Sequence, residues 1–238
     1  MSSDSSGPEL YDAIYGTFKD YVAESAAIAS MVRAAHPRAR TILDVGCGTG
    51  EHAKQLRESH GFNVDGLDKD AGMLAVARRK LPAARFHETD MAAFELGRRY
   101  DVVMCLFSSI GYLRTLPRVS DALRCFREHM VDDGVIIVEP WFAPGALRVG
   151  NGTVNHAEAG GVHVERRSHI EVTGALSILT FDYRIEDASG VRNVREVHEL
   201  CLFTPGEMLA CFREAGLKAA YDPVGLSNRG MYVARTTQ

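Results

Sequence analysis

The sequence predicts an α/β fold in which a mostly parallel, seven-stranded sheet carries helices on both faces. Three observations lead to this prediction. Short buried strands alternate with helical patterns over residues 41–141. A glycine-rich turn joins the first of these strands to the next helix, as in nucleotide-binding α/β proteins. Alternating polar and apolar residues then interrupt the pattern, and they predict an antiparallel β insertion after the fifth strand.

The first part of the chain predicts two helices and then five strands. Residues 1–8 are rich in Ser and are expected to be disordered. Apolar residues at helical spacing over residues 9–36, with a break near Gly16, indicate a short helix followed by a longer one. The strands are predicted at residues 41–46, 62–68, 84–88, 100–107 and 134–141, and the helices between them at 51–60, 71–81 and 118–130. The strands are nearly continuous apolar runs, as expected where both faces of a sheet are covered.

The pattern changes at residues 145–203, where long period-2 stretches are separated by turns that contain Gly. We expect antiparallel hairpins here that pack over one end of the parallel sheet and bind the substrate. A helix with a Thr cap follows at residues 204–216, and two last strands follow at 217–223 and 231–237. The flanking segments form the expected main domain, residues 9–144 and 204–238.

Composition indicates a globular cytoplasmic protein without a nucleic-acid or membrane partner. Of 238 residues, 46% are hydrophobic and 24% are charged, and the formal net charge of -4 offers no basic surface for nucleic acid. The five cysteines are scattered and form no CxxC pair, so we expect reduced thiols and no metal site. No window approaches the ~18 apolar residues of a membrane span, and the polar N-terminus lacks the apolar core of a signal peptide.

The stretch DVGCGTGEH at residues 44–52 places three glycines between a strand and a helix. Because glycine lets a ligand approach the backbone closely at a sharp turn, the candidates are a dinucleotide, a nucleoside triphosphate and S-adenosylmethionine (SAM). A triphosphate-binding loop requires a Lys after its last glycine, and none follows Gly50. A dinucleotide-binding turn would have its third glycine where Glu51 stands, and this carboxylate would repel a pyrophosphate. Both alternatives are therefore disfavoured.

Acidic residues at three strand ends favour SAM, whose α-ammonium and sulfonium groups are positively charged. Asp44 precedes the glycine turn, and Asp68 ends the second strand, where an acid can accept hydrogen bonds from both ribose hydroxyls. With these residues and Asp90 after the third strand, the chain resembles class I SAM-dependent methyltransferases, which have a Rossmann-like fold. In that family the equivalent of Asp90 accepts a hydrogen bond from the adenine amino group, and the equivalent of Met91 lies against the ring.

The resemblance implies SAM as methyl donor, S-adenosylhomocysteine as product and no metal. The residues that it implies in cofactor binding are Tyr21, Asp44, Gly46, Gly48, Gly50, His52, Asp68, Lys69, Asp90, Met91 and Leu106.

Further strings narrow the resemblance, which runs from about residue 9 to the end of the chain. These strings are SSIGYL, EPWFAP, RRSHIEV, LFTPGEMLACFREAGL and GLSNRGMYVA. In this order they are similar to the TDP-amino-deoxysugar N-methyltransferases of antibiotic biosynthesis. The resemblance implies methylation, and indeed dimethylation, of the amino group of a TDP-linked amino-deoxyhexose.

Three residues have candidate roles towards such a substrate. Tyr15 corresponds to a tyrosine near the transferred methyl group and is the candidate catalytic residue, although its spacing from Tyr11 also fits a core position. Trp141 either stacks on the sugar or base or packs in the core, and Arg229 suits a pyrophosphate. The full substrate-binding set is Tyr15, Ser108, Ser109, Trp141, Phe142, Arg166, Ser168, His169 and Arg229.

Methyl transfer from a sulfonium to a neutral amine requires alignment more than a strong base, and alignment can contribute ~7 to 11 kcal/mol. The alternatives are methylation of another small amine, carboxylate or hydroxyl, a SAM-binding protein without catalysis, and, more remotely, a nicotinamide dehydrogenase. The sequence leaves open which amino sugar is used, which ring carbon bears the amine, and whether one or two methyl groups are added. It also leaves open the identity of any general base and whether the chain forms a homodimer.

Overall fold

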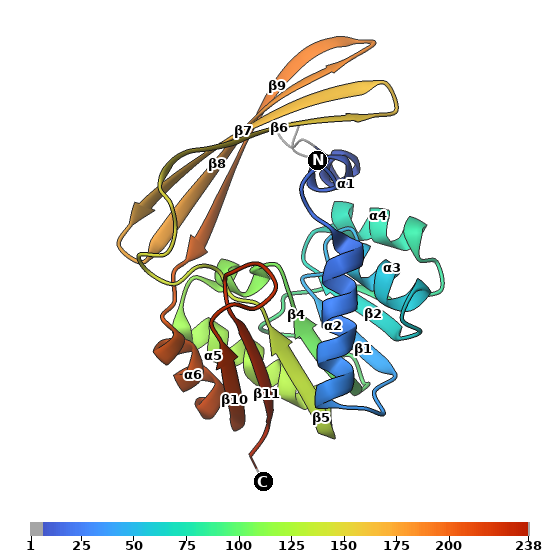
Figure 1. The fold of residues 1–238 in the computed structure, drawn as a ribbon. Coiled ribbons are helices and arrows are strands. Elements are labelled where there is room, and N and C mark those ends of the chain that lie inside the picture. The colour runs from blue at the N-terminus through green and yellow to red at the C-terminus, as the bar shows by residue number, and fades with distance from the viewer. Residues whose placement is uncertain (1–6, 238) are drawn as a thin grey trace.

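The structure is a computed structural model that describes residues 7–237. The strands of its large sheet are β1 (Thr41–Val45), β2 (Asn63–Asp68), β3 (Phe86–Glu88), β4 (Tyr100–Cys105), β5 (Met130–Val138), β10 (Leu217–Asp222) and β11 (Met231–Thr236). The small sheet contains β6 (Gly150–Ala159), β7 (Val162–Thr173), β8 (Leu176–Asp187) and β9 (Gly190–Cys201). Figure 1 shows the small sheet extending above the large one.

Helices occupy the remaining regular segments. They are α1 (Pro8–Tyr15), α2 (Tyr21–Ala35), α3 (Glu51–Glu58), α4 (Ala71–Lys80), the short 3₁₀ helix η1 (Ser109–Leu113), α5 (Leu116–Glu128) and α6 (Pro205–Glu214). Most of the segment predicted to be disordered, residues 1–6, lies outside the described residues, and α1 begins at Pro8. Within residues 7–237, no helix combines the length and apolar character needed to span a membrane.

The large sheet has the order β10-β11-β5-β4-β1-β2-β3, and the small sheet has the order β6-β7-β8-β9. Strands β1 to β5 pair in parallel, and β11 runs antiparallel to both β5 and β10. All pairs in the small sheet are antiparallel. The predicted fold class, a mostly parallel seven-stranded sheet with an antiparallel insertion, is therefore confirmed.

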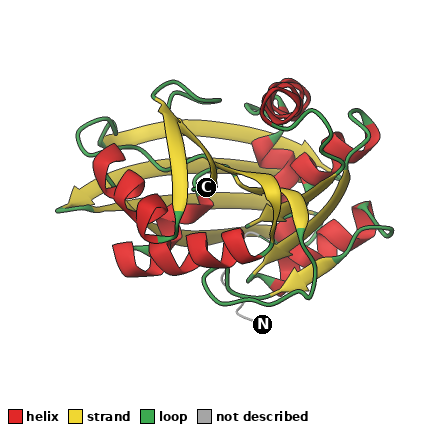
Figure 2. Cartoon of the chain, turned by 90° about the horizontal axis from the view of Figure 1, so that it is seen from below, coloured by secondary structure: helices red, strands yellow, loops and turns green. Residues whose placement is uncertain are grey.

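The core is divided between the two faces of the large sheet. Ile42 and Leu43 are neighbours on β1 and are both fully buried, but Ile42 packs with α2, α3 and α4, whereas Leu43 packs with α5 and α6. Figure 2, a view from below, shows two groups of helices separated by strands. Because both faces are covered, the central strands are apolar at most positions, and the sequence predicts them well.

A third apolar cluster joins the small sheet to α1. Leu10 and Ile14 of α1 pack against the inner face of this sheet, which includes Val164, Phe181 and Val194. The helix therefore lies between the small sheet and the rest of the molecule, as Figure 1 shows.

Three elements differ from the expectation. Strand β6 is not predicted, because its residues are mostly polar and exposed along an edge. The helix η1 is too short to show a period. Helix α5 begins at Leu116, two residues before the predicted start, because Pro117 fits the first turn of a helix.

Candidate active site

The glycine turn that follows β1 has a backbone conformation favoured only by glycine. Gly46, Gly48 and Gly50 have φ angles of 71°, 54° and 78°, in the left-handed region. A Cβ atom on Gly46 would lie 2.7 Å from the side chain of Ser109, and one on Gly50 would lie 3.2 Å from Ala77. Conformation and space therefore both require glycine at these two positions.

A partly open pocket, called the cavity below, lies beside this turn. Its walls are the glycine turn, the loop after β4 and the starts of α2 and α3, with one further tyrosine from α1. The lining residues are Tyr11, Tyr21, Asp44, Gly46, Cys47, Gly48, Thr49, Glu51, His52, Leu106, Phe107 and Ser109. Much of the predicted cofactor set is thus brought together around one space.

Asp44 is the buried acid of this cavity. It is 3% exposed, and within residues 7–237 its carboxylate has no hydrogen-bond or ion-pair partner. Burial raises the pKa of Asp44 to about 6, while His52 lowers it and Asp68 raises it further. A buried carboxylate without a partner favours a cationic ligand. The α-ammonium group of SAM meets this requirement, and a phosphate does not.

Asp68, at the end of β2, lies at the edge of the glycine turn. Its Oδ2 accepts a hydrogen bond from the backbone N–H of Gly48 at 2.9 Å, and its Oδ1 accepts one from the N–H of Asp70 at 3.0 Å. These bonds fix the carboxylate and leave lone pairs for a ribose. The adjacent Lys69 is exposed, and its Nζ lies 5.7 Å from the centre of the Tyr112 ring.

Asp90 and Met91 follow β3 and lie outside the cavity lining. The carboxylate of Asp90 accepts a hydrogen bond from the N–H of Ala92 at 2.8 Å and pairs with Arg118. Desolvation raises the pKa of Asp90, but the hydrogen bonds from Ala92 and Arg118 and the charges of Arg118 and Lys69 together lower it below its usual value. An adenine amino group would share this carboxylate with Arg118. Met91 lies over the turn, with its Cε 3.6 Å from the place that a Cβ on Gly46 would take.

A buried polar cluster fixes the start of α2 beside the cavity. Lys19 Nζ lies 2.8 Å from the carboxylate of Glu24, and the same carboxylate lies 2.9 Å from Nε2 of His52. The Lys19 side chain is 5% exposed, and its Nζ lies 3.5 Å from the centre of the Phe107 ring. Burial lowers the pKa of Lys19, and Glu24 opposes this change. The cluster places His52 and Tyr21 in the wall.

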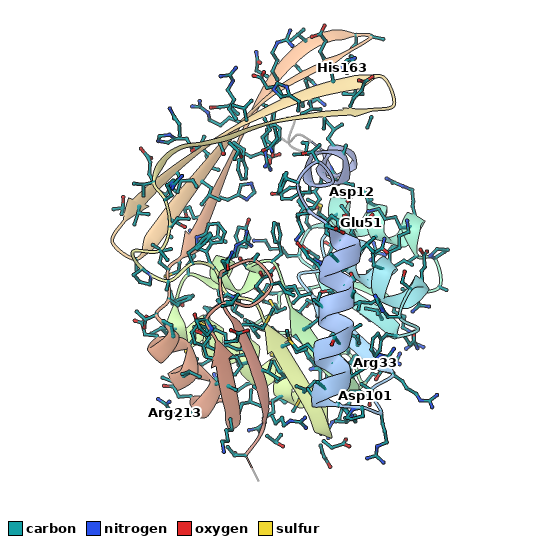
Figure 3. All side chains as sticks on the ribbon, in the orientation of Figure 1. Asp12, Arg33, Glu51, Asp101, His163 and Arg213 are labelled. Carbon is teal, nitrogen blue, oxygen red and sulfur yellow. The ribbon has the colours of Figure 1, made fainter. Side chains whose placement is uncertain are left out.

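A second polar cluster holds α1 on the glycine turn. The hydroxyl of Thr49 donates a hydrogen bond to Asp12 of α1, and Lys80 of α4 pairs with both Asp12 and Glu51. Figure 3 shows Asp12 and Glu51 beside each other, although they come from different helices. We call these four residues the α1 clamp.

Tyr15, at the end of α1, lies among aromatic rings and one arginine. Its ring stacks on Tyr11 with 4.1 Å between centres and contacts Phe107 edge-on at 5.6 Å. The guanidinium carbon of Arg166 lies 5.0 Å from the ring centre. Burial raises the pKa of Tyr15, and Arg166 opposes this effect, so the hydroxyl is neutral at neutral pH.

Arg166, from β7, is buried although it is charged. It is 4% exposed, and its guanidinium lies 4.6 Å from the centre of the Phe181 ring. Nη2 donates a hydrogen bond to Asn155, but Nε and Nη1 have no partner within the described part of the chain. Buried N–H groups of a cation without acceptors favour an anionic ligand.

Arg229 lies in the turn between β10 and β11 and reaches the loop after β4. Its Nη1 donates a hydrogen bond to Ser108 at 3.2 Å, and its guanidinium lies 4.8 Å from the Phe107 ring and 5.2 Å from Trp141. Its Nε is buried without a partner among residues 7–237. Phe142 contacts the same guanidinium at 5.4 Å. Burial lowers the pKa of Arg229, yet only from the very high value of a guanidinium, so the charge is retained.

The loop after β4 is held in an unusual conformation by Glu139. Phe107 and Ser108 have φ angles of 48° and 67°, which residues other than glycine seldom adopt. The buried Glu139 accepts hydrogen bonds from the N–H of Phe107 at 2.8 Å and from the hydroxyl of Ser227. The Ser108 hydroxyl donates to the carbonyl of Pro140 at 2.9 Å. Strain held in this way is typical of functional loops.

The remaining predicted substrate residues lie in two different environments. Trp141 donates a hydrogen bond from its indole N–H to Ser177 at 2.8 Å and thereby joins the two sheets. Ser168 lies on the same face of β7 as Arg166, but its hydroxyl is bonded to the backbone of Thr153. His169 lies on the opposite face, because successive strand residues alternate, and it contacts Asn151 at 3.0 Å. We therefore leave His169 out of the proposed substrate set.

Comparison with known proteins identifies the family of this chain. A family model described as a methyltransferase domain matches residues 42–134. Over 94% of this chain and 88% of the relative, the chain is 41% identical to the dTDP-3-amino-3,6-dideoxy-alpha-D-glucopyranose N,N-dimethyltransferase of Streptomyces fradiae. It is 38% identical to the dTDP-3-amino-3,4,6-trideoxy-alpha-D-glucopyranose N,N-dimethyltransferase of Streptomyces venezuelae, over 94% of this chain and 95% of the relative. The chain belongs to the TDP-amino-deoxysugar N-methyltransferases.

Solved structures of this N-methyltransferase family agree with the fold. DesVI of Streptomyces venezuelae superposes with a TM-score of 0.90 at 37% identity, over 96% of this chain and 98% of that one. SAM-bound CalS10, an amino pentose methyltransferase from Micromonospora echinaspora, superposes with a TM-score of 0.85 at 36% identity, over 96% and 97% of the two chains. The protein is thus a methyltransferase whose methyl donor is SAM, and the unpaired Asp44 carboxylate fits that cationic donor.

Sequence reasoning missed several residues of this site. Two of these residues, Glu139 and His198, contact partners that are distant in the sequence, namely Phe107 and Tyr112. The third, Lys19, pairs with the nearby Glu24, and nothing in the local pattern distinguishes it from an ordinary surface lysine. A signal was present for His198, because the apolar Val194 and Leu200 on either side at even spacing assign it to the inner face of its strand.

Proposed function

We propose that this N-methyltransferase transfers methyl groups from SAM to the amino group of a TDP-linked amino-deoxyhexose, and that it adds two. The two relatives from Streptomyces fradiae and Streptomyces venezuelae are N,N-dimethyltransferases of dTDP-amino sugars. The reaction is an in-line displacement in which the amine forms a bond to the methyl carbon while the sulfonium leaves with the electron pair of the C–S bond. The amine must be free of its proton when it attacks the methyl carbon.

The observation that carries the proposal is a pair of arginines, Arg166 buried and Arg229 half-buried, that both have unused N–H groups. Arg166 and Arg229 enter the site from different sheets, and each has at least one buried N–H without a partner among the described residues. A diphosphate provides acceptors for both guanidinium groups, and a guanidinium can donate two parallel hydrogen bonds to one phosphate. Aromatic rings beside both arginines, among them Phe181 and Trp141, suit the sugar and the base.

We further propose roles for the cofactor residues. Asp44 binds the α-ammonium group, Asp68 binds the ribose hydroxyls, and the glycine turn gives the cofactor close access to the backbone. Tyr15 lies where α1 covers the cavity, and its neutral hydroxyl and ring assist alignment of the amine with the methyl group. The small sheet, with residues 145–203, forms the substrate-binding cover. The cytoplasmic location and the homodimer remain predictions.

The proposal is tested by incubating the protein with SAM and a panel of TDP-3-amino and TDP-4-amino deoxyhexoses, followed by mass spectrometry of the nucleotide sugars. We expect a gain of one and then two methyl masses on at least one sugar. If SAM binds but no sugar gains mass, the proposed substrate class is wrong.

Replacement of Arg229 tests the diphosphate contact separately. Arg229→Ala is expected to raise KM for the nucleotide sugar about 10- to 100-fold, because a charge-assisted hydrogen bond to phosphate contributes about 1.5 to 3 kcal/mol. Arg195→Ala is the matched control, since Arg195 is an exposed residue of the small sheet that pairs with Asp182. An unchanged KM in Arg229→Ala would remove this arginine from the substrate site.

A further inference from the structure

A chain of polar side chains connects the loop after β4 to the inner face of the small sheet. The hydroxyl of Tyr112 lies 2.9 Å from Nδ1 of His198. Nε2 of His198 lies 3.6 Å from the carboxylate of Glu196, which also accepts a hydrogen bond from Tyr183 at 3.0 Å. Tyr112 comes from η1 and the other three residues come from β8 and β9, so the chain links both sheets.

Tyr112 lies near residues of the proposed cofactor site, although it does not line the cavity itself. Tyr112 is three residues after Ser109, which lines the cofactor cavity, and its ring lies 5.7 Å from Nζ of Lys69, next to the ribose-site residue Asp68. Gly111 fixes the loop here, because a Cβ atom on it would lie 3.2 Å from both Leu200 and Trp141.

His198 is held so that both ring nitrogens have defined partners. Its ring packs on Phe181 with 5.2 Å between centres, and its side chain is 31% exposed, so a proton on it has a path to solvent. Glu196, His198 and Tyr112 thus place a carboxylate, an imidazole and a hydroxyl in series. In this arrangement the imidazole can take up a proton from the hydroxyl. Although Tyr112 is 39% exposed, partial desolvation and then the neighbouring Tyr15, Asp68 and Glu196 raise its pKa, so its hydroxyl keeps its own proton at neutral pH.

We propose that Tyr112 and His198 form the route by which the acceptor amine loses its proton, and this rests on the proposed function. The bound ammonium gives a proton to the Tyr112 oxygen, whose own proton passes to Nδ1 of His198. The imidazolium is then stabilised by Glu196 and returns the proton to water. The freed lone pair bonds to the methyl carbon. The methylated ammonium product carries a proton again, so a second transfer needs the same step.

Other charged groups lie near Tyr112 and His198 and influence how readily this pair takes up a proton. Lys69 faces the ring of Tyr112, and Arg166, near Tyr15 and Tyr183, opposes positive charge on the inner face. Arg114 and Glu199 pair with each other beside the loop and contribute little net charge. Glu196 is the negative group closest to the imidazole among the contacts described, and we assign it a positioning role.

The test is the pH dependence of methylation in three variants. His198→Gln and Tyr112→Phe are expected to lower kcat at pH 7 about 100-fold, the low end of general-base effects. The loss should shrink as the pH rises above the pKa of the free amine, because the sugar then binds without its proton. Glu196→Gln should move the midpoint of the profile to lower pH, since the imidazolium loses its stabilising charge and His198 is then neutral at a lower pH.

His169→Gln is the matched control, because His169 lies on the outer face of the same sheet and should leave kcat and its pH profile unchanged. Calorimetric titration with SAM checks that each variant is folded. If the wild type methylates a sugar and His198→Gln, while binding SAM normally, keeps its kcat at pH 7, the proton route is wrong and the function stands. If the wild type binds SAM but methylates no amino sugar, the function itself is wrong, and the proton route is overturned with it.

Discussion

At the scale of single residues, the site contains charged groups that lower the stability of the free protein and that a bound ligand would stabilise. Asp44 and Arg166 are buried and Arg229 is half-buried, and each has unused hydrogen-bonding capacity. Folding alone would not favour such groups, since each loses hydration without gaining a protein partner. Their presence is explained by ligands that supply the missing partners.

Asp44→Asn should therefore stabilise the free protein and weaken SAM binding. The folded pKa of about 6 lies above the ordinary value of 3.8, so the stability that Asp44 contributes when protonated is lost as pH rises through 6. At pH 7 the ionised Asp44 therefore lowers the free energy of unfolding by up to about 3 kcal/mol, at 1.36 kcal/mol per pKa unit. We expect a higher Tm without ligand and a smaller rise in Tm on adding SAM. A lower Tm without ligand would contradict the assigned cost.

SAM affinity should fall in acid for the same reason. Only ionised Asp44 attracts the α-ammonium group, so below pH 6 the affinity is expected to drop about tenfold per pH unit. Calorimetry at pH 6 should also show proton release on binding, as a heat that varies with the ionisation enthalpy of the buffer. Affinity that is equal at pH 5 and pH 7.5 would exclude Asp44 as the ammonium site.

At the scale of elements, the predictable parts are those fixed by local pattern. The strands of the large sheet are identified by apolar periodicity, and the glycine turn, Asp44 and Asp68 are identified by their positions at strand ends. Strand β6 and the Tyr112–His198 contact are harder to predict from the sequence, because β6 is polar and the two residues of the contact are 86 positions apart. Periodicity assigns a residue to a face of its strand, but it does not identify the residue on the opposing element.

Helix α1 offers a prediction at this scale, because its clamp joins it to the cofactor turn. Asp12→Ala removes the acceptor of both Thr49 and Lys80, whose contacts are partly exposed. We expect a loss of about 1 to 2 kcal/mol, or about 5- to 30-fold in SAM affinity, seen as faster SAM dissociation in stopped-flow experiments. Asp132→Ala, a fully exposed residue on the other side of the molecule, is the control. An unchanged dissociation rate would show that the clamp does not retain the cofactor.

At the scale of the whole molecule, the two sheets form two compartments that share α1. The large sheet and its glycine turn form the cofactor compartment, and the small sheet forms the proposed substrate cover. Leu10 and Ile14 pack against the small sheet, while Asp12, on the same two turns of helix, is held by the glycine turn. Movement of this helix therefore affects both compartments.

This shared helix has a consequence for the order of events in dimethylation. Between the two transfers, spent cofactor must leave and fresh SAM must enter, and this exchange requires α1 to move off the turn. The same movement withdraws Leu10 and Ile14 from the small sheet and loosens the cover over the half-modified sugar. The enzyme should thus be distributive rather than processive: in a time course, free monomethyl sugar rises early, passes through a maximum and is consumed only once the unmethylated sugar has been depleted.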